Sequence, residues 1–264
     1  MKNPIQSLFP LFRLLPVLGL SWTVAVLAEP ETEAAAGADL PSVGGLYRKH
    51  IDANGGRSNL QSIQTVMVKG TVFAEDEAPD YEITIFRKRP DRMRLISRFP
   101  NYTVESVWNG ERGVRRWTQA NGRTEEVEID AGNRAELLGD DQMDGPFFRL
   151  GGRDAFLEVE ALEEVDGHPC VRLRVLPAAD VVHDYIWLSL EHYQEVKLMS
   201  REEPGADGSD DRERSVLFDQ FEQVDGVWFA LRSRFYSDDR LTRTLRIEDV
   251  RTNVGIYDSY FRLD

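Results

Sequence analysis

The side chains best suited to chemistry are the histidines and the single cysteine, and neither set forms a catalytic pattern. His183 and Asp184 are adjacent in a strand pattern, so they point to opposite faces and cannot act as a base with its orienting partner. Cys170 in a strand is typical of a small core residue. The four scattered histidines are His50, His168, His183 and His192. We also find no nucleophile elbow, phosphate loop, dinucleotide fingerprint or paired-histidine zinc helix, and therefore expect no enzyme and no cofactor.

Two acidic clusters offer oxygen ligands for a cation. One contains Asp140, Asp141 and Asp144, and the other lies within residues 207–211. Neither has the spacing of an EF-hand loop, with its central glycine and terminal bidentate glutamate. Solvated loop charge is the stronger interpretation, so the sequence predicts no metal site.

A basic run stands out between Arg87 and Arg116. It holds nine basic and three acidic residues, a local charge of +6 in an acidic chain. One interpretation is an outer sheet face whose charges pair with the acidic excess. The other is attraction to anionic lipid headgroups or to an acidic partner.

The elements that would position these residues are mostly strands. Asp166-Gly167 and Asp225-Gly226 each separate two runs of alternating apolar residues, and Asn109-Gly110 and Asn121-Gly122 recur earlier. Asx-Gly pairs suit tight hairpins because these turns require positive φ. One apolar and one polar face per strand indicates an antiparallel sheet that is wet on one side.

Two segments depart from the strand pattern. Residues 41–56 predict one short helix, with Leu46 on its apolar face and Gly55-Gly56 as its stop. Residues 130–152 interrupt the alternation, and residues 131–138 there suggest a helix. The apolar residues around Gly145-Pro146 form either a lid across the sheet or a crossover that plugs the core.

The N-terminus predicts export. Lys2 and Arg13 precede an apolar run that ends at Ala28 with small residues at the cleavage positions, and the run is short for a membrane span. We therefore expect a signal peptide over 1–28 that is cleaved after Ala28, a flexible leader over 29–40 and one domain over 41–264. An uncleaved N-terminal anchor is the alternative. This organisation predicts a periplasmic protein.

Charge narrows the class of partner. Without the signal peptide, 30 basic residues stand against 46 acidic ones, a formal charge of −16. Such a chain repels nucleic acid and itself, which favours a monomer. With one cysteine it has no internal disulfide, and its stability must come from a hydrophobic core.

Several loose motifs together resemble a known family, the LolA-type periplasmic lipoprotein carriers and outer-membrane lipoprotein-sorting proteins. The resemblance spans about residues 42 to 262. The matching stretches are 51–56 with Leu60, Ile63 and the strand up to Gly70, then 89–94, 108–113, 165–169, 185–188, 224–230 and 247–253, and finally Phe261. The resemblance implies an unclosed β-barrel, a large curved antiparallel sheet of about 11 strands with a few covering helices. It also implies that an apolar concave face binds acyl chains or other hydrophobic molecules without covalent chemistry.

The function predicted on this basis is an exported carrier or sensor for a lipid, an acyl chain or a lipoprotein. The alternative is a non-catalytic envelope scaffold with the same fold, bound to protein partners. A hollow apolar cavity favours the carrier, and a sheet filled by its own side chains favours the scaffold. The residues predicted to contact the ligand are Trp108, Phe147, Phe148, Leu173, Val175, Ile186, Leu188, Phe229, Leu231 and Leu245.

Overall fold

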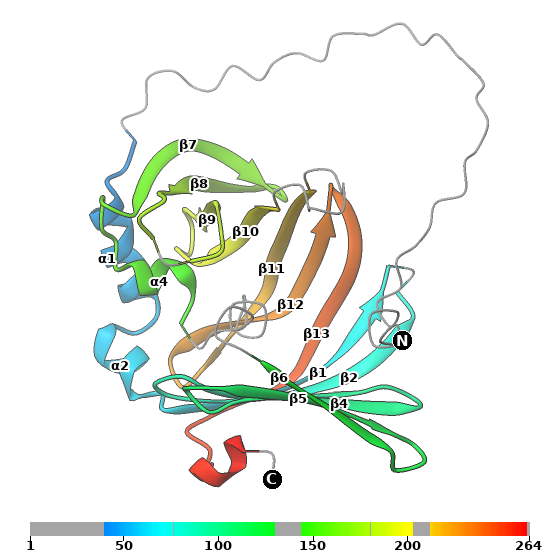
Figure 1. The fold of residues 1–264 in the computed structure, drawn as a ribbon. Helices are drawn as coiled ribbons and strands as arrows, with labels where there is room; N and C mark the ends of the chain where they lie inside the picture. Colours follow the sequence, from blue (N-terminus) through cyan, green and yellow to red (C-terminus); the bar gives the residue numbers. More distant parts are fainter. Residues whose placement is uncertain (1–39, 76, 130–143, 180, 203–211, 263–264) are drawn as a thin grey trace, which may run out of the picture. The chain divides into compact units, whose positions relative to one another are not determined.

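Thirteen antiparallel strands form one open sheet in the computed structural model (Figure 1). The structure describes residues 40–75, 77–129, 144–179, 181–202 and 212–262, which belong to one unit over residues 34–264. The N-terminal meander comprises β1 Thr65–Ala74, β2 Pro79–Lys88, β3 Arg92–Arg98, β4 Tyr102–Trp108, β5 Gly113–Gln119 and β6 Thr124–Ile129. The C-terminal meander comprises β7 Leu157–Val165, β8 His168–Val175, β9 Tyr185–Ser189, β10 Glu195–Glu202, β11 Arg212–Val224, β12 Val227–Ser237 and β13 Arg240–Thr252.

The two meanders are joined by their first and last strands. Within each meander neighbours in sequence pair with each other, and β1 pairs with β13 to make one continuous sheet. β6 and β7 remain as the two edges, so the sheet does not close. The predicted open, mainly β architecture is confirmed.

The predicted number of strands was too low, at about 11 against 13 observed. The value of about 11 came from the family resemblance, and the Asn121-Gly122 turn was the sequence signal for the edge strand β6. Its sequence, TEEVEI, buries Ile129 alone. An edge strand that is solvated on both faces carries little apolar alternation, which is the signal that identifies strands in a sequence.

The Asp-Gly turns have the predicted geometry. Asp166 and Gly167 have φ values of 52° and 83°, and Asp225 and Gly226 have 48° and 79°. Asn109 and Asn121 act differently, because their side-chain oxygens accept hydrogen bonds from the backbone N–H groups that follow in the loop. Only the glycine of each Asn-Gly pair has positive φ.

Helices α1, Val43–Ala53, and α4, Pro146–Leu150, pack against each other beside β7 (Figure 1). The predicted helix over residues 41–56 is shorter than expected. Ser42 caps its start, and Asn54 and Gly55 end it before a second helix, α2, Arg57–Ser62. The helix predicted over residues 131–138 lies outside the described residues.

Strand register defines two faces of the sheet. We call the concave face the one on which α1 and α4 pack, with Leu173, Ile186, Leu198 and Val216, and the opposite one the outer face. The short helix η2, Asp258–Phe261, packs against β3, and its Asp258 pairs with Lys88 and Arg92.

The concave face carries two main clusters of buried residues. The helix-filled cluster joins α1 and α4 to β7–β11: Val43, Leu46, Tyr47, Ile51, Phe147, Leu150, Leu157, Val171, Leu173, Ile186, Leu188, Leu198 and Val216. The strand-only cluster lies mainly on the N-terminal meander: Val72, Ile83, Ile85, Met93, Trp108, Ile129 and Leu245. Both clusters contact Phe235 of β12, so they meet in the middle of the sheet.

Candidate functional site

A cavity of about 240 Å³ opens on the concave face near the seam of β1 and β13. We call it the concave cavity. Its apolar lining is Leu60, Val66, Val68, Ile85, Phe148, Phe218, Phe221, Val227, Trp228, Phe229, Ala230, Leu245 and Ile247. Its polar lining is His50, Asn54, Arg87, Asp144, Gln194, Glu195 and Ser233. Gly145 also lines the cavity.

Strand register builds the floor of the concave cavity. Val68 stands opposite Ile85 on β2, while Ser233 of β12 stands opposite Leu245 on β13 and Phe218 on β11. Partners in an antiparallel pair share a face, so these residues face the same side across adjacent strands. The floor is therefore apolar from β2 to β11, broken by the hydroxyl of Ser233.

Helix α4 forms part of the wall, and its two phenylalanines have different roles. Phe147 is fully buried, packs edge-on against Tyr47 and His50 of α1, and donates its backbone N–H to Glu195 at 2.8 Å. Phe148 is half-buried and lines the concave cavity. Phe147 thus anchors α4, and Phe148 faces the concave cavity.

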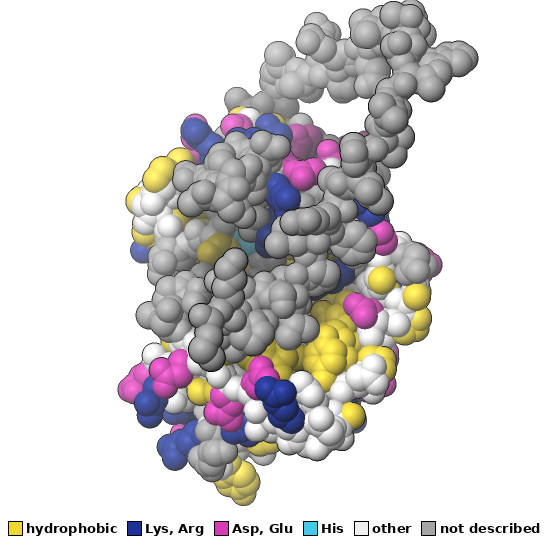
Figure 2. Space-filling view, turned by 45° about the vertical axis from the view of Figure 1, so that its right-hand side comes forward, with side chains coloured by type: hydrophobic (Ala, Val, Ile, Leu, Met, Phe, Trp, Pro, Cys, Tyr) yellow, Lys and Arg dark blue, Asp and Glu magenta, His cyan; other side chains and the backbone are white. Residues whose placement is uncertain are grey.

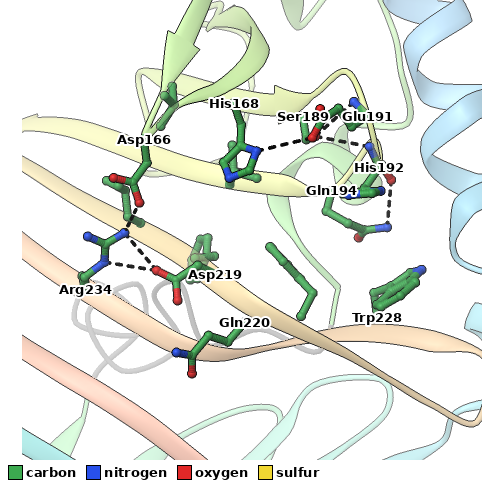
Figure 3. A pocket seen from close by; sticks show the side chains of 15 residues that line it. Asp166, His168, Ser189, Glu191, His192, Gln194, Asp219, Gln220, Trp228 and Arg234 are labelled. Atoms are coloured by element: carbon green, nitrogen blue, oxygen red, sulfur yellow. Dashed lines mark hydrogen bonds and ion pairs between the residues drawn. The ribbon is translucent and has the colours of Figure 1, made fainter.

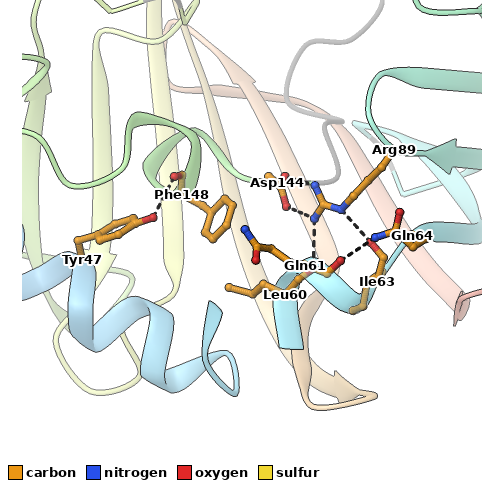
Figure 4. A network of polar contacts seen from close by, with 8 residues as sticks. All are labelled: Tyr47, Leu60, Gln61, Ile63, Gln64, Arg89, Asp144 and Phe148. Atoms are coloured by element: carbon orange, nitrogen blue, oxygen red, sulfur yellow. Dashed lines mark hydrogen bonds and ion pairs between the residues drawn. The ribbon is translucent and has the colours of Figure 1, made fainter. Parts of the chain in front are cut away.

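An ion pair ties the start of α4 to the β2–β3 connection (Figure 4). The Arg89 guanidinium donates to both carboxylate oxygens of Asp144 at 2.5 and 2.6 Å. It also donates to the carbonyl oxygens of Ile63 at 2.8 Å and Leu60 at 3.2 Å. Its bond to Asp144 raises the pKa of Arg89, so the pair stays charged. Arg89 therefore fastens both α2 and α4 to the sheet.

On the α1 side, His50 is a buried polar group of the cavity wall. Its Nδ1 lies 2.7 Å from the carbonyl oxygen of Tyr193, in the β9–β10 turn. Burial lowers the pKa of His50, so the ring is neutral near pH 7 and donates from Nδ1. Asn54 donates to the Gln194 side chain at 3.4 Å, which adds a second link from α1 to the same turn.

Three of the ten residues predicted to contact the ligand line the concave cavity: Phe148, Phe229 and Leu245. Phe147, Leu173, Ile186 and Leu188 lie in the helix-filled cluster with no exposed surface, and Val175 packs against that cluster. Trp108 is buried in the strand-only cluster, and Leu231 is half-buried on β12. The structure thus brings some of the ten together and places others beneath α1 and α4.

Sequence reasoning missed several cavity residues. Val66 and Val68 carried the apolar alternation of the first strand, so their signal was present. Arg87 follows Ile83 and Ile85 on the same face of β2. The alternation that identified the two isoleucines could therefore also have placed Arg87 on the cavity face. No sequence pattern predicts Asp144, Gln194 or Glu195 at the cavity, because only tertiary packing brings them there.

The basic run is largely paired, which favours the first of its two interpretations. Besides the bonds of Arg89 and the pairing of Lys88 and Arg92 with Asp258, Arg94 pairs with Glu105 and Arg116 with Glu126. Of the carboxylate partners, Asp144, Asp258 and Glu126 lie outside the run, and they offset half of its +6 charge.

The other chemical candidates show structural roles. Burial raises the pKa of Cys170 to about 11, and its thiol donates to the carbonyl oxygen of His168. His183 lies 3.1 Å from the Ser200 hydroxyl, while Asp184 accepts from the backbone N–H of Arg201. Within the described ranges, no group of His, Cys, Asp and Glu side chains is placed to hold a metal ion. No helix in those ranges is long and apolar enough to cross a membrane.

The chain is similar to several solved structures at low sequence identity. A DUF1329 family protein from Desulfovibrio piger matches 83% of this chain and 97% of its own, with 11% identity and a TM-score of 0.51. A LolA superfamily protein from Nitrosomonas europaea matches 84% and 98% respectively, with 12% identity and a TM-score of 0.47. LprF from Mycobacterium bovis matches 83% and 97%, with 10% identity and a TM-score of 0.30.

No family model and no curated protein matches the sequence. At identities near 10%, similarity between structures is evidence for the fold alone. The open antiparallel sheet and its similarity to the Desulfovibrio piger protein confirm the LolA-like fold that the sequence resemblance predicted.

Proposed function

We propose that the protein is an exported carrier that binds the acyl chain of a lipid or lipoprotein in the concave cavity, without catalysis. The observation that carries this proposal is the apolar floor formed by Val68, Ile85, Phe229, Leu245 and Ile247 across the seam of the two meanders. Hydrophobic side chains also gather on the face shown in Figure 2, bordered by charged ones. Such a floor with a polar rim is typical of a small-molecule site.

Burial of the chain supplies the binding energy. Each methylene group removed from water contributes about 0.8 kcal/mol. The concave cavity, at about 240 Å³, is smaller than most ligand pockets, which measure about 300–1,000 Å³. A long acyl chain therefore requires the wall to move outward.

Helix α4 is the part of the wall suited to move. It begins after Gly145 and ends at Gly151, which adopts the left-handed conformation. The Arg89–Asp144 pair holds its N-terminal end, and the backbone bond from Phe147 to Glu195 holds its first turn. In this proposal ligand entry breaks the ion pair, swings Phe148 away from the floor, and leaves Phe147 as the pivot.

The test compares two serine variants. Ser233→Leu places an apolar side chain in the concave cavity, whereas Ser215→Leu places the same side chain on the outer face of β11. With a fluorescent fatty acid, we expect Ser233→Leu to weaken binding about tenfold or more and Ser215→Leu to leave it unchanged. Equal affinities in two folded variants contradict the proposed site.

The cargo itself is best found by native mass spectrometry of the purified mature protein, followed by lipid extraction. We expect a co-purified lipid and a monomer. The same spectrum tests export, because cleavage after Ala28 removes residues 1–28 from the intact mass. A mass that includes Met1 or Lys2 contradicts cleavage and supports the anchor.

A second candidate function, the envelope scaffold, is favoured by the helix-filled cluster. There α1 and α4 occupy the concave face, and Leu173, Ile186 and Leu188 have no exposed surface left for a ligand. If the mature protein carries no lipid and binds no fatty acid, the scaffold replaces the carrier. Bound lipid excludes a purely structural role.

A further inference from the structure

A second cavity, of about 350 Å³, lies on the outer face beside β10 and β11 (Figure 3). We call it the outer groove. Its apolar lining is Val165, Val196, Leu217, Phe218, Phe221 and Trp228. Leu217 and Arg234 stand opposite each other on β11 and β12, on the face opposite to Val216 of the helix-filled cluster. This alternation places the groove behind the concave cavity.

The sheet is split where the outer groove lies: β10 and β11 separate beyond Leu217, and we call this gap in the strand pairing the split. β10 pairs with β11 from Lys197 opposite Leu217 to Glu202 opposite Arg212, and β11 then continues to Val224 beside β12 alone. Within β11, Gln220 has a φ of 54°, a left-handed conformation that is rare for a non-glycine residue in a strand. Such strain persists only where the surrounding structure holds it, and such sites are often functional.

Contacts with α1 hold the split open. Tyr193, in the β9–β10 turn, accepts a hydrogen bond from His50 at its carbonyl oxygen and one from Lys49 Nζ, at 2.9 Å, at its hydroxyl. Gln194 accepts from Asn54. These bonds fix the turn to α1, and β10 therefore does not extend along residues 218–224 of β11.

The two cavities meet at this split. Gln194, Phe218, Phe221 and Trp228 line both the concave cavity and the outer groove. The same side chains therefore border both spaces, and Trp228 is 36% exposed although it is large and apolar. A flexible chain that displaces these side chains can pass from one face of the sheet to the other.

The far end of the outer groove is charged. Figure 3 places Trp228 at one end and Asp166, Arg234 and Asp219 at the other. Arg234 bonds to Asp166 at 2.5 Å and to Asp219 at 2.9 Å, and Asp219 also pairs with Arg232. Glu191 lies 3.3 Å from His168 between the two ends. The lining holds the three carboxylates of Asp166, Glu191 and Asp219 against the guanidinium of Arg234. With Arg232, which pairs with Asp219 from outside the lining, and without counting the histidines, one net negative charge is left, which favours a cation over an anion.

We propose that the outer groove binds the headgroup of an amphiphile that bears an ammonium group, while the acyl chain passes through the split into the concave cavity. This inference rests on the proposed function, because it assigns a headgroup class to the same acyl ligand. The apolar end beside the split receives the first methylene groups, and the carboxylates beyond them receive the ammonium.

The experiment compares headgroups on one tail. Three amphiphiles with equal alkyl chains, ending in trimethylammonium, hydroxyl or carboxylate, are titrated below their micelle concentrations into the full mature protein. We expect the ammonium compound to bind tightest and the carboxylate weakest. We also expect the ammonium preference to weaken as salt rises, because partly exposed charges are screened.

A double variant, Asp166→Asn with Glu191→Gln, removes two carboxylates from the outer groove. Asparagine tolerates the positive φ of residue 166, so the turn is kept. Glu164→Gln is the matched control, since Glu164 is exposed close to this turn but does not line the groove. We expect the double variant to lose about threefold to tenfold in ammonium affinity with hydroxyl binding unchanged, and the control to lose nothing.

The outcomes separate the two proposals. If all three amphiphiles bind equally, or if the ammonium preference survives in the double variant, the headgroup site is overturned and the carrier stands. If no amphiphile binds, the carrier is overturned and the headgroup site with it.

Discussion

The two halves of the concave face are covered in different ways. In the C-terminal meander α1 and α4 fill the concave face, and Phe147, Leu173, Ile186 and Leu188 have no exposed surface. The strand-only cluster is equally buried but consists of strand residues alone, and large hydrophobic residues are exposed in both halves, among them Tyr102 and Val127 in one and Leu162 and Trp228 in the other. Both clusters are buried, so the halves differ in whether helices contribute to the core and not in whether a core is present.

In the proposed carrier, the helix-filled cluster supplies stability and the region near the seam supplies the binding surface. Interdigitated side chains without voids stabilise a domain, whereas partly exposed apolar side chains retain the free energy that a ligand gains by covering them. The concave cavity lies where the two meanders meet: β1 and β2 contribute Val66, Val68, Ile85 and Arg87, and β10–β13 contribute most of the remaining strand residues. Variants on either side of this boundary test the division.

The largest effect is expected from Phe147→Ala. Deleting a fully buried phenylalanine costs about 3–5 kcal/mol in the free energy of unfolding. Phe148→Ala is the matched control, because Phe148 is half-buried at the cavity, and it should cost less stability but weaken fatty-acid binding. Urea denaturation and a fluorescent fatty acid measure the two quantities. Equal losses of stability in both variants contradict the assigned roles.

Next in size is the effect of Arg89→Met. Loss of its bonds to Asp144 and to two carbonyl oxygens should lower the free energy of unfolding by about 2–3 kcal/mol, since hydrogen bonds to charged groups are strong. Binding should respond in the opposite direction, with faster entry of a fatty acid, because α4 is released.

Asp144→Asn and the double variant complete a cycle for this pair. We expect a coupling of about 1–2 kcal/mol in the free energy of unfolding. If the losses in the free energy of unfolding of the two single variants add fully in the double variant, Arg89 and Asp144 do not stabilise the protein as a pair.

A smaller effect is expected at the two Asp-Gly turns. Valine at a left-handed position costs about 1–2 kcal/mol, so both Gly167→Val and Gly226→Val should lower the melting temperature. Gly226→Val should be the worse of the two. A Cβ atom there meets the Asn59 side-chain nitrogen at 2.8 Å, whereas the space around Gly167 is open within 4 Å. Unchanged melting of both variants contradicts the turn geometry.

The smallest effect concerns pH and His50, which lies at the boundary between the halves. Its pKa is lowered in the folded state from 6.5, so the unfolded chain takes up a proton first as pH falls. The free energy of unfolding should be constant above about pH 6.5 and decrease below it, down to the lowered pKa of the folded state.

The measurement is urea denaturation at several pH values. His50→Gln should remove this part of the pH dependence, whereas His192→Gln, at an exposed site, should keep it. A His50→Gln profile identical to that of the unmodified protein contradicts the role of His50.

Much of the fold follows from the sequence because it is written in local patterns. Val171, Leu173 and Val175 alternate with arginines in the predicted way, and Asp166-Gly167 and Asp225-Gly226 adopt the predicted turn. The edge strand β6 was indicated only by the Asn121-Gly122 turn before it, and of its residues Ile129 is the one that is buried.

The site follows from the sequence only in part. Phe229 and Leu245 were predicted because their faces are apolar, but the same criterion selected Leu173 and Ile186, which α1 and α4 cover. A periodic pattern shows which residues share a face, and it does not show what packs on that face. The pairing of Arg89 with Asp144, 55 positions apart, is likewise a product of tertiary structure.

The seam between β1 and β13 also constrains how the protein is made. Thr65 and Val254, which are hydrogen-bonded beside this seam, stand 189 positions apart, whereas nearly every other strand pairs with its neighbour in sequence. Each meander can assemble locally, but the cavity floor forms only after the last strand has emerged and found the first. Closing such a long loop is slow, and the two unjoined strands present apolar edges meanwhile. A chain truncated before residue 240 therefore lacks Leu245 and Ile247, two of the five floor residues, and leaves β1 without its partner strand.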